Sequence, residues 1–379
     1  MTIVLVSGSC PPMQCGVGDY TARLALELSK LQPGAVGILT SDVTNRESAG
    51  EDNVSVHSVM PNWSLSSLRI LLHVLKRERP EIVHFQFPTA GYGKGLTPWL
   101  APLVTSMMGY NVVQTWHEGY TSRQIPTMLL KALAPGRLIV VRENYAQLLR
   151  PWLRWILPLR KWTYIASTST IPKHQLTPEM KDNLRAKFPA DKKLLVFFGF
   201  VHRDKGVHRI FEVANPDQHH IVIAGPMTYL DEYCSELRRQ CAESRWASSV
   251  ETTGHLPQKE VANLLAIADA VVLPFEKGGG QWNTSIEAAK LNGAFVLTTS
   301  LTEMGYSPKT DTFFATPGDT LQMKEALAKR FSGSYQPDQT PSEENPWRRI
   351  AREHLSVYNS LLPEGRHLKE HSESGLNNA

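Results

Sequence analysis

The sequence predicts an α/β protein with two tandem domains, each built on a doubly wound parallel sheet. In the first part of the chain, short β-rich runs alternate with amphipathic helical stretches. This alternation is typical of parallel sheets, because parallel strands need long crossover connections that are usually helices. The same rhythm restarts after a polar stretch at residues 173–193. A length of 379 residues accommodates two domains of about 150 residues each.

The expected strands are runs rich in Val, Ile, Leu and Phe. In the first domain they cover residues 3–7, 35–39, 82–85, 111–115 and 138–141, and in the second domain residues 194–198, 220–224, 250–253, 270–274 and 294–298. Amphipathic periodicity predicts helices between them, for example at residues 20–31 and 65–77. A last helical pattern covers residues 347–362, with Ser342 and the two glutamates after it as the expected N-cap and first-turn acids.

These patterns divide the chain into five segments. We expect a first domain at residues 1–170, a linker at 171–190 and a second domain at 191–340. A C-terminal helix is expected within residues 341–363, followed by a disordered polar tail at 364–379.

Charge and cysteine content exclude several classes of protein. The 40 Lys and Arg exceed the 36 Asp and Glu by only +4, which disfavours dedicated nucleic-acid binding. The four cysteines form no Cys-x-x-Cys, so neither a disulfide framework nor a structural zinc is indicated. The apolar run at residues 3–6 is too short for a signal peptide, and no apolar run is long enough to cross a membrane. We therefore expect a cytoplasmic protein.

The loop after the first expected strand contains Gly16, Gly18 and Asp19, where the next helix is expected to open. Glycines before a helix N-terminus let backbone N–H groups approach a phosphate or a sugar. Position 21 is Thr, so the Gly-x-Gly-x-x-Gly fingerprint of dinucleotide-dependent hydride transfer is absent. A plain strand-to-helix turn with Asp19 as its cap explains the loop equally well.

His117 follows the fourth expected strand of the first domain. The carboxyl ends of parallel strands line the crevice in which open α/β sheets bind ligands. A histidine there can hydrogen-bond a sugar hydroxyl or act as an acid or base. The alternative is an ordinary histidine whose hydrogen bonds are satisfied within the protein.

In the second domain, Gly199, Arg203 and Lys205 follow the first expected strand. Their charge and donors suit a diphosphate, although Arg203 also fits a solvated surface position. A glycine-rich loop lies further along the chain, and the residues of an expected anion cradle there are Gly278, Gly279, Gly280, Asn283, Thr284 and Ser285. They precede a helix expected at residues 286–291, whose N-terminus favours negative charge. The alternative is a flexible surface loop.

A segment at residues 149–162 interleaves three tryptophans with four cations. Trp152, Trp155, Trp162 and Arg154 are the residues expected to contact an anionic membrane, because indole rings and basic side chains suit the bilayer interface. Two prolines interrupt any long amphipathic helix there. The alternative is a helix end between domains or in a core, with arginines extending to water.

Taken together and in this order, these motifs resemble the family 4 glycosyltransferases of the GT-B fold. The resemblance covers nearly the whole chain, from the loop at residues 16–21 to the helix that carries Trp347 and Tyr358. It implies two Rossmann-like domains, an acceptor bound by the first and a UDP- or GDP-linked sugar bound by the second. It also implies that the C-terminal helix crosses back onto the first domain, and that transfer proceeds with retention and without a metal. No Asp-x-Asp occurs in the sequence.

The resemblance assigns roles to individual residues. Lys205 matches the lysine that neutralises the donor diphosphate, and His117 matches the histidine beside the transferred sugar. The usual arginine partner is replaced by Phe200, which leaves Arg203 as a substitute. The usual Glu-x7-Glu pair is also broken, which indicates a divergent branch and leaves Glu276 and Glu287 as the acids that could reach the donor.

We therefore expect a retaining hexosyltransferase that builds a polysaccharide or glycolipid. Its partners would be a nucleotide sugar and a glycan or lipid-linked acceptor, with no metal and no further cofactor. It would act in the cytoplasm or on the cytoplasmic face of the membrane. Two alternatives stay open: a non-catalytic GT-B-like module that binds a nucleotide or glycan, and a sugar-nucleotide epimerase on the same fold.

Overall fold

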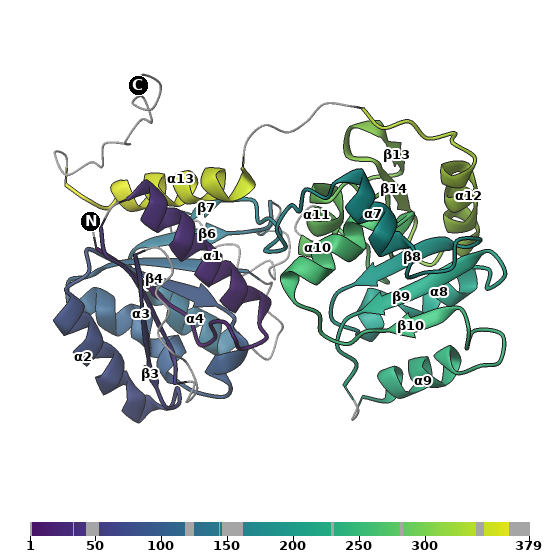
Figure 1. The fold of residues 1–379 in the computed structure, drawn as a ribbon. Helices are drawn as coiled ribbons and strands as arrows, with labels where there is room; N and C mark the ends of the chain where they lie inside the picture. Colours follow the sequence, from purple (N-terminus) through teal and green to yellow (C-terminus); the bar gives the residue numbers. More distant parts are fainter. Residues whose placement is uncertain are drawn as a thin grey trace, which may run out of the picture. The chain divides into compact units, whose positions relative to one another are not determined.

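A computed structural model describes residues 2–32, 34–42, 53–117, 125–143, 145, 162–228, 231–280, 283–338 and 345–363. The chain forms two compact units (Figure 1). The first unit combines residues 1–167 with residues 343–379, and the second unit consists of residues 168–342. The border after Ser167 lies close to the domain boundary expected at residue 170.

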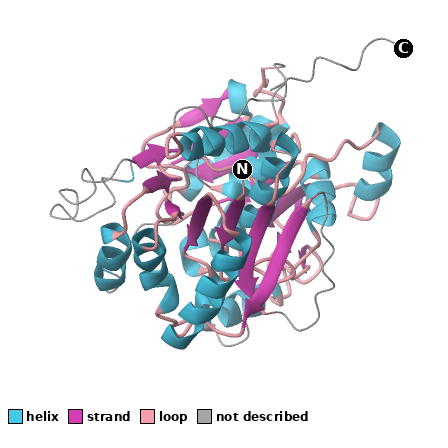
Figure 2. Ribbon diagram, turned by 90° about the vertical axis from the view of Figure 1, so that its left-hand side faces the viewer, coloured by secondary structure: helices cyan, strands magenta, loops and turns pink. Residues whose placement is uncertain are grey.

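The first unit is a seven-stranded parallel sheet in the order β3-β2-β1-β4-β5-β6-β7. Its strands are β1 (Ile3–Val6), β2 (Val36–Ser41), β3 (Val54–Met60), β4 (Ile82–Phe87), β5 (Asn111–Trp116), β6 (Arg137–Val140) and β7 (Trp162–Tyr164). Its helices are α1 (Gly16–Leu31), η1 (Leu65–Ser67), α2 (Leu68–Glu78), η2 (Ala90–Tyr92), α3 (Thr97–Met107), α4 (Ile125–Leu133) and α13 (Pro346–Asn359). Figure 2 shows helices flanking these strands.

Both faces of this sheet are apolar, and alternate residues of each strand point to opposite faces. In β1, Ile3 and Leu5 join the core beneath α1 and α13. Val4 and Val6 join the core that contains Leu71 and Leu75 of α2. The continuous Val and Ile runs are therefore explained by burial on both sides rather than by one buried face.

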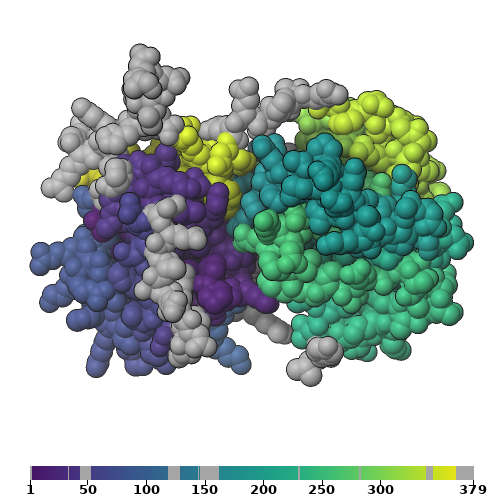
Figure 3. All heavy atoms as spheres, in the orientation of Figure 1, coloured from purple at the N-terminus to yellow at the C-terminus, as the bar shows by residue number. Residues whose placement is uncertain are grey.

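Helix α13 belongs to the first unit although it follows the second unit in the sequence. Its inner face places Trp347, Ile350 and Tyr358 in the same core as α1, and Figure 3 shows the two helices as adjoining yellow and purple surfaces. The helix begins at Pro346 with Asn345 as N-cap, whose side chain accepts a hydrogen bond from Trp347 N at 3.0 Å. The expected cap at Ser342 is thus wrong, because Asn345 immediately precedes the proline that opens the helix.

The second unit holds a second seven-stranded sheet, in the order β10-β9-β8-β11-β12-β14-β13. Its strands are β8 (Lys193–Phe198), β9 (His219–Ala224), β10 (Val250–Thr252), β11 (Ala270–Leu273), β12 (Val296–Thr299), β13 (Gly305–Ser307) and β14 (Thr312–Ala315). Its helices are α7 (Pro178–Arg185), η5 (Arg203–Lys205), α8 (His208–Val213), α9 (Glu232–Cys241), α10 (Gln258–Ile267), α11 (Thr284–Leu291), η6 (Pro308–Thr310) and α12 (Thr320–Phe331). All pairs are parallel except β13 with β14.

The linker expected at residues 171–190 is also corrected by the structure. This stretch belongs to the second unit and contains α7, which packs against α10. Thr177 caps the helix by accepting a hydrogen bond from Met180 N at 3.2 Å, and Pro178 is the first helical residue. No residue of α7 is buried, so the helix lacks the apolar periodicity on which the sequence analysis depended.

Candidate functional site

The strand order of the second unit reverses between β8 and β11, and we call the region at the carboxyl ends of these two strands the β8–β11 crevice. From β8 the chain proceeds to β9 and β10 on one side, whereas β11 leads to β12 and β14 on the other. Loops that leave two such neighbouring strands diverge, and open α/β sheets bind their ligands there. All the site residues predicted for this unit follow these two strands, so the structure brings the two groups together.

Gly199 exposes bare backbone at the end of β8. Its φ is +139°, and a Cβ at this position would lie 3.2 Å from Ser285 Oγ of α11. A Cβ on Gly225, which follows the neighbouring strand β9, would overlap the carbonyl oxygen of Gly199. Because neither residue carries a Cβ, the Gly199 backbone lies directly against Gly225 and against Ser285 at the start of α11.

The N-terminus of α11 is capped from within. Asn283 accepts a hydrogen bond from Ser285 N at 3.1 Å through its side chain, and its backbone oxygen accepts from Ile286 N at 3.0 Å. Thr284 opens the helix and Ser285 is buried beside Gly199. The Asn283 side chain, predicted as part of the anion cradle, therefore serves as the helix cap in this structure.

The glycine-rich loop folds tightly against the end of β12. Gly278 has a φ of +76° and lies against Leu301, while Gly279 N donates a hydrogen bond to Thr299 O at 2.6 Å. A Cβ on Gly279 would lie 2.5 Å from the ring of Phe275. The carbonyl of Gly280 accepts a hydrogen bond from Asn283 N at 2.9 Å. The glycines thus allow a compact turn that carries the chain from β11 to α11.

Lys205 is the half-buried cation of this crevice. It ends η5, and its Nζ lies 4.9 Å from the centre of the Phe275 ring, at the end of β11. The two loops are joined by Glu276 N, which donates a hydrogen bond to Asp204 O at 3.0 Å. Lys205 is thereby held over the loop that leads to the glycines.

Arg203 points toward α9. Its Nη2 forms an ion pair with Glu236 of α9 at 3.1 Å, and its guanidinium lies 5.0 Å from the centre of the Tyr233 ring. The side chain is 61 % exposed, so the ion pair is a weak one that an anionic ligand can replace. The structure therefore places the two predicted cations on different neighbours.

The two acids considered as donor ligands are also paired. Glu276 Oε1 lies 3.0 Å from Arg209 Nε and 3.2 Å from His208 Nε2. Burial lowers the pKa of His208, although the Glu276 carboxylate opposes that shift. Glu287 forms an ion pair with Lys290 at 2.7 Å within α11. Both carboxylates thus have cationic partners within the second unit.

The first unit has its own divergence of loops, between β1 and β4. Here the loops meet closely, since a Cβ on Gly91 would overlap the carbonyl oxygen of Gly8. Gly91 N also donates a hydrogen bond to Ser9 Oγ at 2.8 Å. The loops after β1 and β4 therefore approach each other through glycine backbone.

Gly16, Gly18 and Asp19 lie inside α1 and not before it. The helix begins at Gly16 after the N-cap Cys15, and Asp19 lies in its first turn. A Cβ on Gly18 would lie 3.0 Å from the backbone of Ser9, whereas Gly16 has open space. The expected turn with Asp19 as cap is thus wrong, because the helix starts one residue after Cys15. Gly18 permits the close approach of α1 to the loop after β1.

His117 follows β5 at the carboxyl edge of the first sheet. Its backbone N–H bonds to Phe87 O at 2.7 Å, its Nε2 lies 2.8 Å from Gln86 Oε1, and its ring meets the Tyr20 ring edge-on at 4.7 Å. Burial, aided by His354, lowers the pKa of His117 to about 3. The imidazole is therefore neutral at neutral pH, which suits hydrogen bonding to a hydroxyl better than proton donation.

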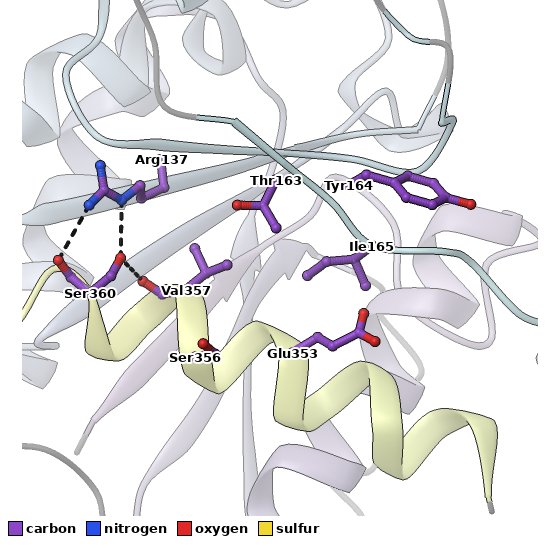
Figure 4. Close-up of a pocket in the computed structure, with 8 residues that line it drawn as sticks. All are labelled: Arg137, Thr163, Tyr164, Ile165, Glu353, Ser356, Val357 and Ser360. Atoms are coloured by element: carbon purple, nitrogen blue, oxygen red, sulfur yellow. Dashed lines mark hydrogen bonds between the residues drawn. The ribbon is translucent and has the colours of Figure 1, made fainter.

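A cavity of about 270 Å³ lies between β6, β7 and α13. Figure 4 shows Arg137, Tyr164, Glu353 and Ser360 around it, with Arg137 bonded to Ser360 at 3.0 Å. None of the predicted site residues lines this cavity. Within the described ranges, no three His, Cys, Asp or Glu side chains gather where they could hold a metal ion.

The predicted membrane segment is mostly outside the described residues, and this includes Trp152, Arg154 and Trp155. Trp162 is described, and its side chain is 41 % exposed at the start of the edge strand β7. In the part of the chain that the structure describes, no helix combines the length and the apolar character needed to cross a bilayer.

Several residues near the carboxyl ends of the strands in the two units were not predicted as site residues, namely Gln86, Gly91, His208, Arg209 and Gly225. Gly225 could have been found, because it follows the apolar run of β9 just as Gly199 follows that of β8. Gln86 also lies next to the end of its strand. The pairing of Arg209 with Glu276 joins residues that are 67 positions apart, and no local sequence pattern predicts it.

Comparison with known proteins finds a family match within the second unit. Residues 192–332 match the family model described as Glycosyl transferases group 1. The matched segment begins just before β8 and ends after α12, so it includes both loops of the crevice. No curated protein sequence matches this chain.

Solved structures with the same fold span nearly the whole chain. A glycosyltransferase from Rickettsia africae is 14 % identical with a TM-score of 0.67, over 96 % of this chain and 99 % of its own. Sucrose-phosphate synthase from Thermosynechococcus elongatus is 14 % identical with a TM-score of 0.67, over 95 % and 99 %. HepE from Anabaena, solved with UDP-glucose, is 13 % identical with a TM-score of 0.65, over 95 % of each chain.

These similarities confirm the predicted fold class, two Rossmann-like α/β domains of the GT-B type. The match to the second unit further supports a glycosyltransferase. The chain thus has the GT-B fold, and its second unit carries a segment that matches Glycosyl transferases group 1.

Proposed function

We propose that this protein is a retaining glycosyltransferase that transfers a hexose from a UDP- or GDP-linked donor to a glycan or lipid-linked acceptor. The resemblance to family 4 supports a role in polysaccharide or glycolipid assembly. The match of residues 192–332 to Glycosyl transferases group 1 supports the activity. The UDP-glucose found in Anabaena HepE supports a nucleotide-sugar donor.

The observation that carries the proposal is the set of groups at the β8–β11 crevice. Lys205 is held at the loop after β11, and the bare backbone of Gly199 lies against Ser285 at the start of α11. Breaking the sugar–phosphate bond leaves extra negative charge on the departing diphosphate. A half-buried lysine and the positive end of a helix stabilise such charge, and preorganised groups of this kind lower the barrier most.

The proposed chemistry needs no resident metal. The charge of the diphosphate is balanced by Lys205, with Arg203 available once the ligand replaces Glu236 as its partner. Arg209 is already paired with Glu276 and holds that loop in place. Unchanged turnover after treatment with EDTA is the expected result, and full recovery of lost activity by Mg²⁺ or Mn²⁺ would contradict it.

The first unit would bind the acceptor and offer His117 to the transferred sugar. Since the ring is neutral at neutral pH, its contribution is a hydrogen bond to a sugar hydroxyl. Retention is checked directly by the anomeric configuration of the product, measured by NMR before it equilibrates. An inverted product would overturn the stereochemical part of the proposal while leaving the activity intact.

Lys205→Ala tests the proposal. Loss of one group that stabilises the leaving charge is expected to reduce turnover of the accepted nucleotide sugar about 100-fold or more. Lys277→Ala is the matched control, because Lys277 is 77 % exposed and pairs with Asp204 in the neighbouring loop. Its turnover should stay near that of the wild type. If both variants turn over donor normally, the assignment of Lys205 fails.

A non-catalytic binding module is the second candidate, favoured by the ion pairs that already engage Arg203 and Glu287. Binding of a nucleotide sugar without transfer or hydrolysis would identify it, and Lys205→Ala would then weaken affinity only. Conversion of the donor to an isomeric nucleotide sugar without any acceptor would instead identify an epimerase. A screen of nucleotide sugars by thermal shift selects the donor for all of these assays.

A further inference from the structure

A line of hydrogen-bonded side chains connects α13 to His117 inside the first unit. Tyr358 Oη lies 2.7 Å from His84 Nδ1, and Gln86 Nε2 lies 3.3 Å from His84 Nε2. Gln86 Oε1 then lies 2.8 Å from His117 Nε2. We call Tyr358, His84 and Gln86 the relay. Thr115 Oγ1 supports it from β5, 2.7 Å from His84 Nε2.

The relay is shut off from water. Tyr358, His84, Gln86 and Thr115 are each 0 % exposed. Burial lowers the pKa of His84 well below its usual value, and it lowers that of His117 to about 3. Each imidazole therefore carries a single N–H at neutral pH, with one ring nitrogen as donor and the other as acceptor.

This single proton makes the directions of the hydrogen bonds depend on one another. The Gln86 carbonyl accepts from His117 Nε2–H, while its amide group donates to His84 Nε2. The proton of His84 must then be on Nδ1, where it is donated to Tyr358 Oη. In this arrangement His117 keeps Nδ1 as its acceptor atom.

Removal of the Tyr358 hydroxyl would reverse the direction of the hydrogen bonds in the relay. The N–H of His84 Nδ1 would lose its acceptor, and a buried donor without an acceptor destabilises the protein. Moving that proton to Nε2 avoids the cost, since Thr115 Oγ1 and a rotated Gln86 carbonyl can both accept it. The Gln86 amide would then donate to His117 Nε2, and His117 would carry its proton on Nδ1.

We propose that Tyr358, acting through His84 and Gln86, fixes the tautomer and orientation of His117 so that Nδ1 accepts a hydrogen bond from a hydroxyl of the bound sugar. Tyr358 and His84 are positioning residues, since neither forms a hydrogen bond with His117 and both act through Gln86. The sugar part of this proposal rests on the proposed function, whereas the tautomer of His117 does not.

Tyr358→Phe tests the relay on the full chain. With ¹⁵N-labelled histidine, NMR distinguishes donor from acceptor ring nitrogens, and His117→Gln and His84→Gln assign the signals. We expect wild-type His117 to be protonated on Nε2 and His84 on Nδ1. In Tyr358→Phe the proton should move to His117 Nδ1 and to His84 Nε2. Gln86→Met removes the hydrogen bond between residue 86 and His117. In this background the position of the His117 proton should no longer depend on residue 358.

Tyr92→Phe is the matched control. Its buried hydroxyl donates to Val6 O at 3.1 Å in the same unit and takes no part in the relay. The His117 signals should therefore stay as in the wild type. Unchanged His117 signals in Tyr358→Phe, or a wild-type ring protonated on Nδ1, would overturn the relay whether or not the protein transfers sugar.

Activity supplies the second readout. Fluorine cannot donate a hydrogen bond to Nδ1, so the wild-type enzyme should discriminate against the donor analogue whose contacted hydroxyl is replaced by fluorine. Tyr358→Phe should narrow that preference by about threefold to tenfold, the net worth of one hydrogen bond. A moved proton with an unchanged preference for every monofluorinated analogue would refute the sugar contact and leave the relay standing.

Discussion

The two units share one sheet design but differ in the charge of the predicted site residues at the carboxyl ends of their strands. In the second unit, Lys205, Arg203 and Arg209 gather around the loops after β8 and β11. In the first unit, the predicted site residue that follows β5 is His117, whose ring is neutral at neutral pH.

The difference shows how one architecture can serve two kinds of ligand. Cations and a helix N-terminus suit the charged diphosphate of a donor. Buried neutral groups with a fixed hydrogen-bond direction suit sugar hydroxyls, which carry no charge and are recognised by donor and acceptor pattern. Each of the following experiments changes one side of this contrast.

The largest effect is expected from adding a methyl group where the backbone is tightest. Gly91→Ala in the first unit and Gly225→Ala in the second would each force a Cβ onto a carbonyl oxygen, of Gly8 and Gly199 respectively. Overpacking of this kind costs about 1–3 kcal/mol, so the Tm should fall by about 2–12 °C. Gly225→Ala should also weaken donor binding, because it displaces Gly199, whereas Gly91→Ala should not.

Gly16→Ala is the control for both variants. No atom lies within 4 Å of a Cβ built at this position, so differential scanning calorimetry should show an unchanged or slightly raised Tm. A loss of stability in this variant equal to that of Gly91→Ala would mean that close approach is not the cause.

The next largest effect, counted per histidine and per pH unit, is a loss of stability of the first unit in acid. An unfolded histidine binds a proton near pH 6.5, whereas burial lowers the pKa to about 3 for His117 and about 4 for His354. Below pH 6.5 the unfolded state therefore binds more protons, and the free energy of unfolding falls as the pH falls. Each histidine contributes up to about 1.4 kcal/mol per pH unit. In the second unit, Glu276, Asp269 and Glu251 oppose the corresponding shifts of His208, His219 and His220.

Hydrogen exchange at pH 7, 6 and 5 checks this difference unit by unit. Peptides from β4, β5 and α13 should lose protection in acid before those from β8 and β9. His354→Gln should reduce the pH slope, and His73→Gln, at an exposed position of α2, should not. Equal acid sensitivity of the two units would remove the contrast between them.

The smallest effect concerns the membrane hypothesis, which involves the first unit alone. Binding to vesicles with anionic lipids should fall about fivefold on Arg154→Gln, because a basic residue near such a surface contributes about 1 kcal/mol. Trp152→Ala and Trp155→Ala should weaken it further, and added salt should weaken it in the wild type. Equal vesicle binding by all of these variants would exclude this segment as the contact.

Much of the fold could be predicted because its central strands are buried on both faces. β1 is an unbroken apolar run, whereas the apolar residues of β4 and β5 are interrupted by His84, Gln86 and Gln114. The apolar stretches that remain are visible in one sequence. β3, β7, β13 and β14 were not predicted. β3, β7 and β13 each lie at a sheet edge and are only partly buried, so pairing with a neighbour decides their conformation more than their own residues do. β14 is an inner strand, but its run Thr312–Ala315 has only four residues.

The part of the candidate site that directly follows the ends of strands could be predicted from the sequence. Gly199 and His117 each follow a strand directly, and the structure places them at the carboxyl edges of the two sheets. The relay could not be predicted, because the contact of His84 with Tyr358 joins residues 274 positions apart. Such a contact depends on how α13 packs, and no local sequence pattern specifies it.

The return of α13 to the first unit has a consequence for synthesis on the ribosome. The core under Tyr20, Leu24 and Leu28 of α1 is completed by residues of α13, and the whole second unit is translated between these two helices. At a synthesis rate of about 5–20 residues per second, this side of the first unit stays without α13 for roughly ten to forty seconds. During that interval its apolar surface is open to chaperones or to a neighbouring nascent chain, so the first unit starts folding first and finishes last.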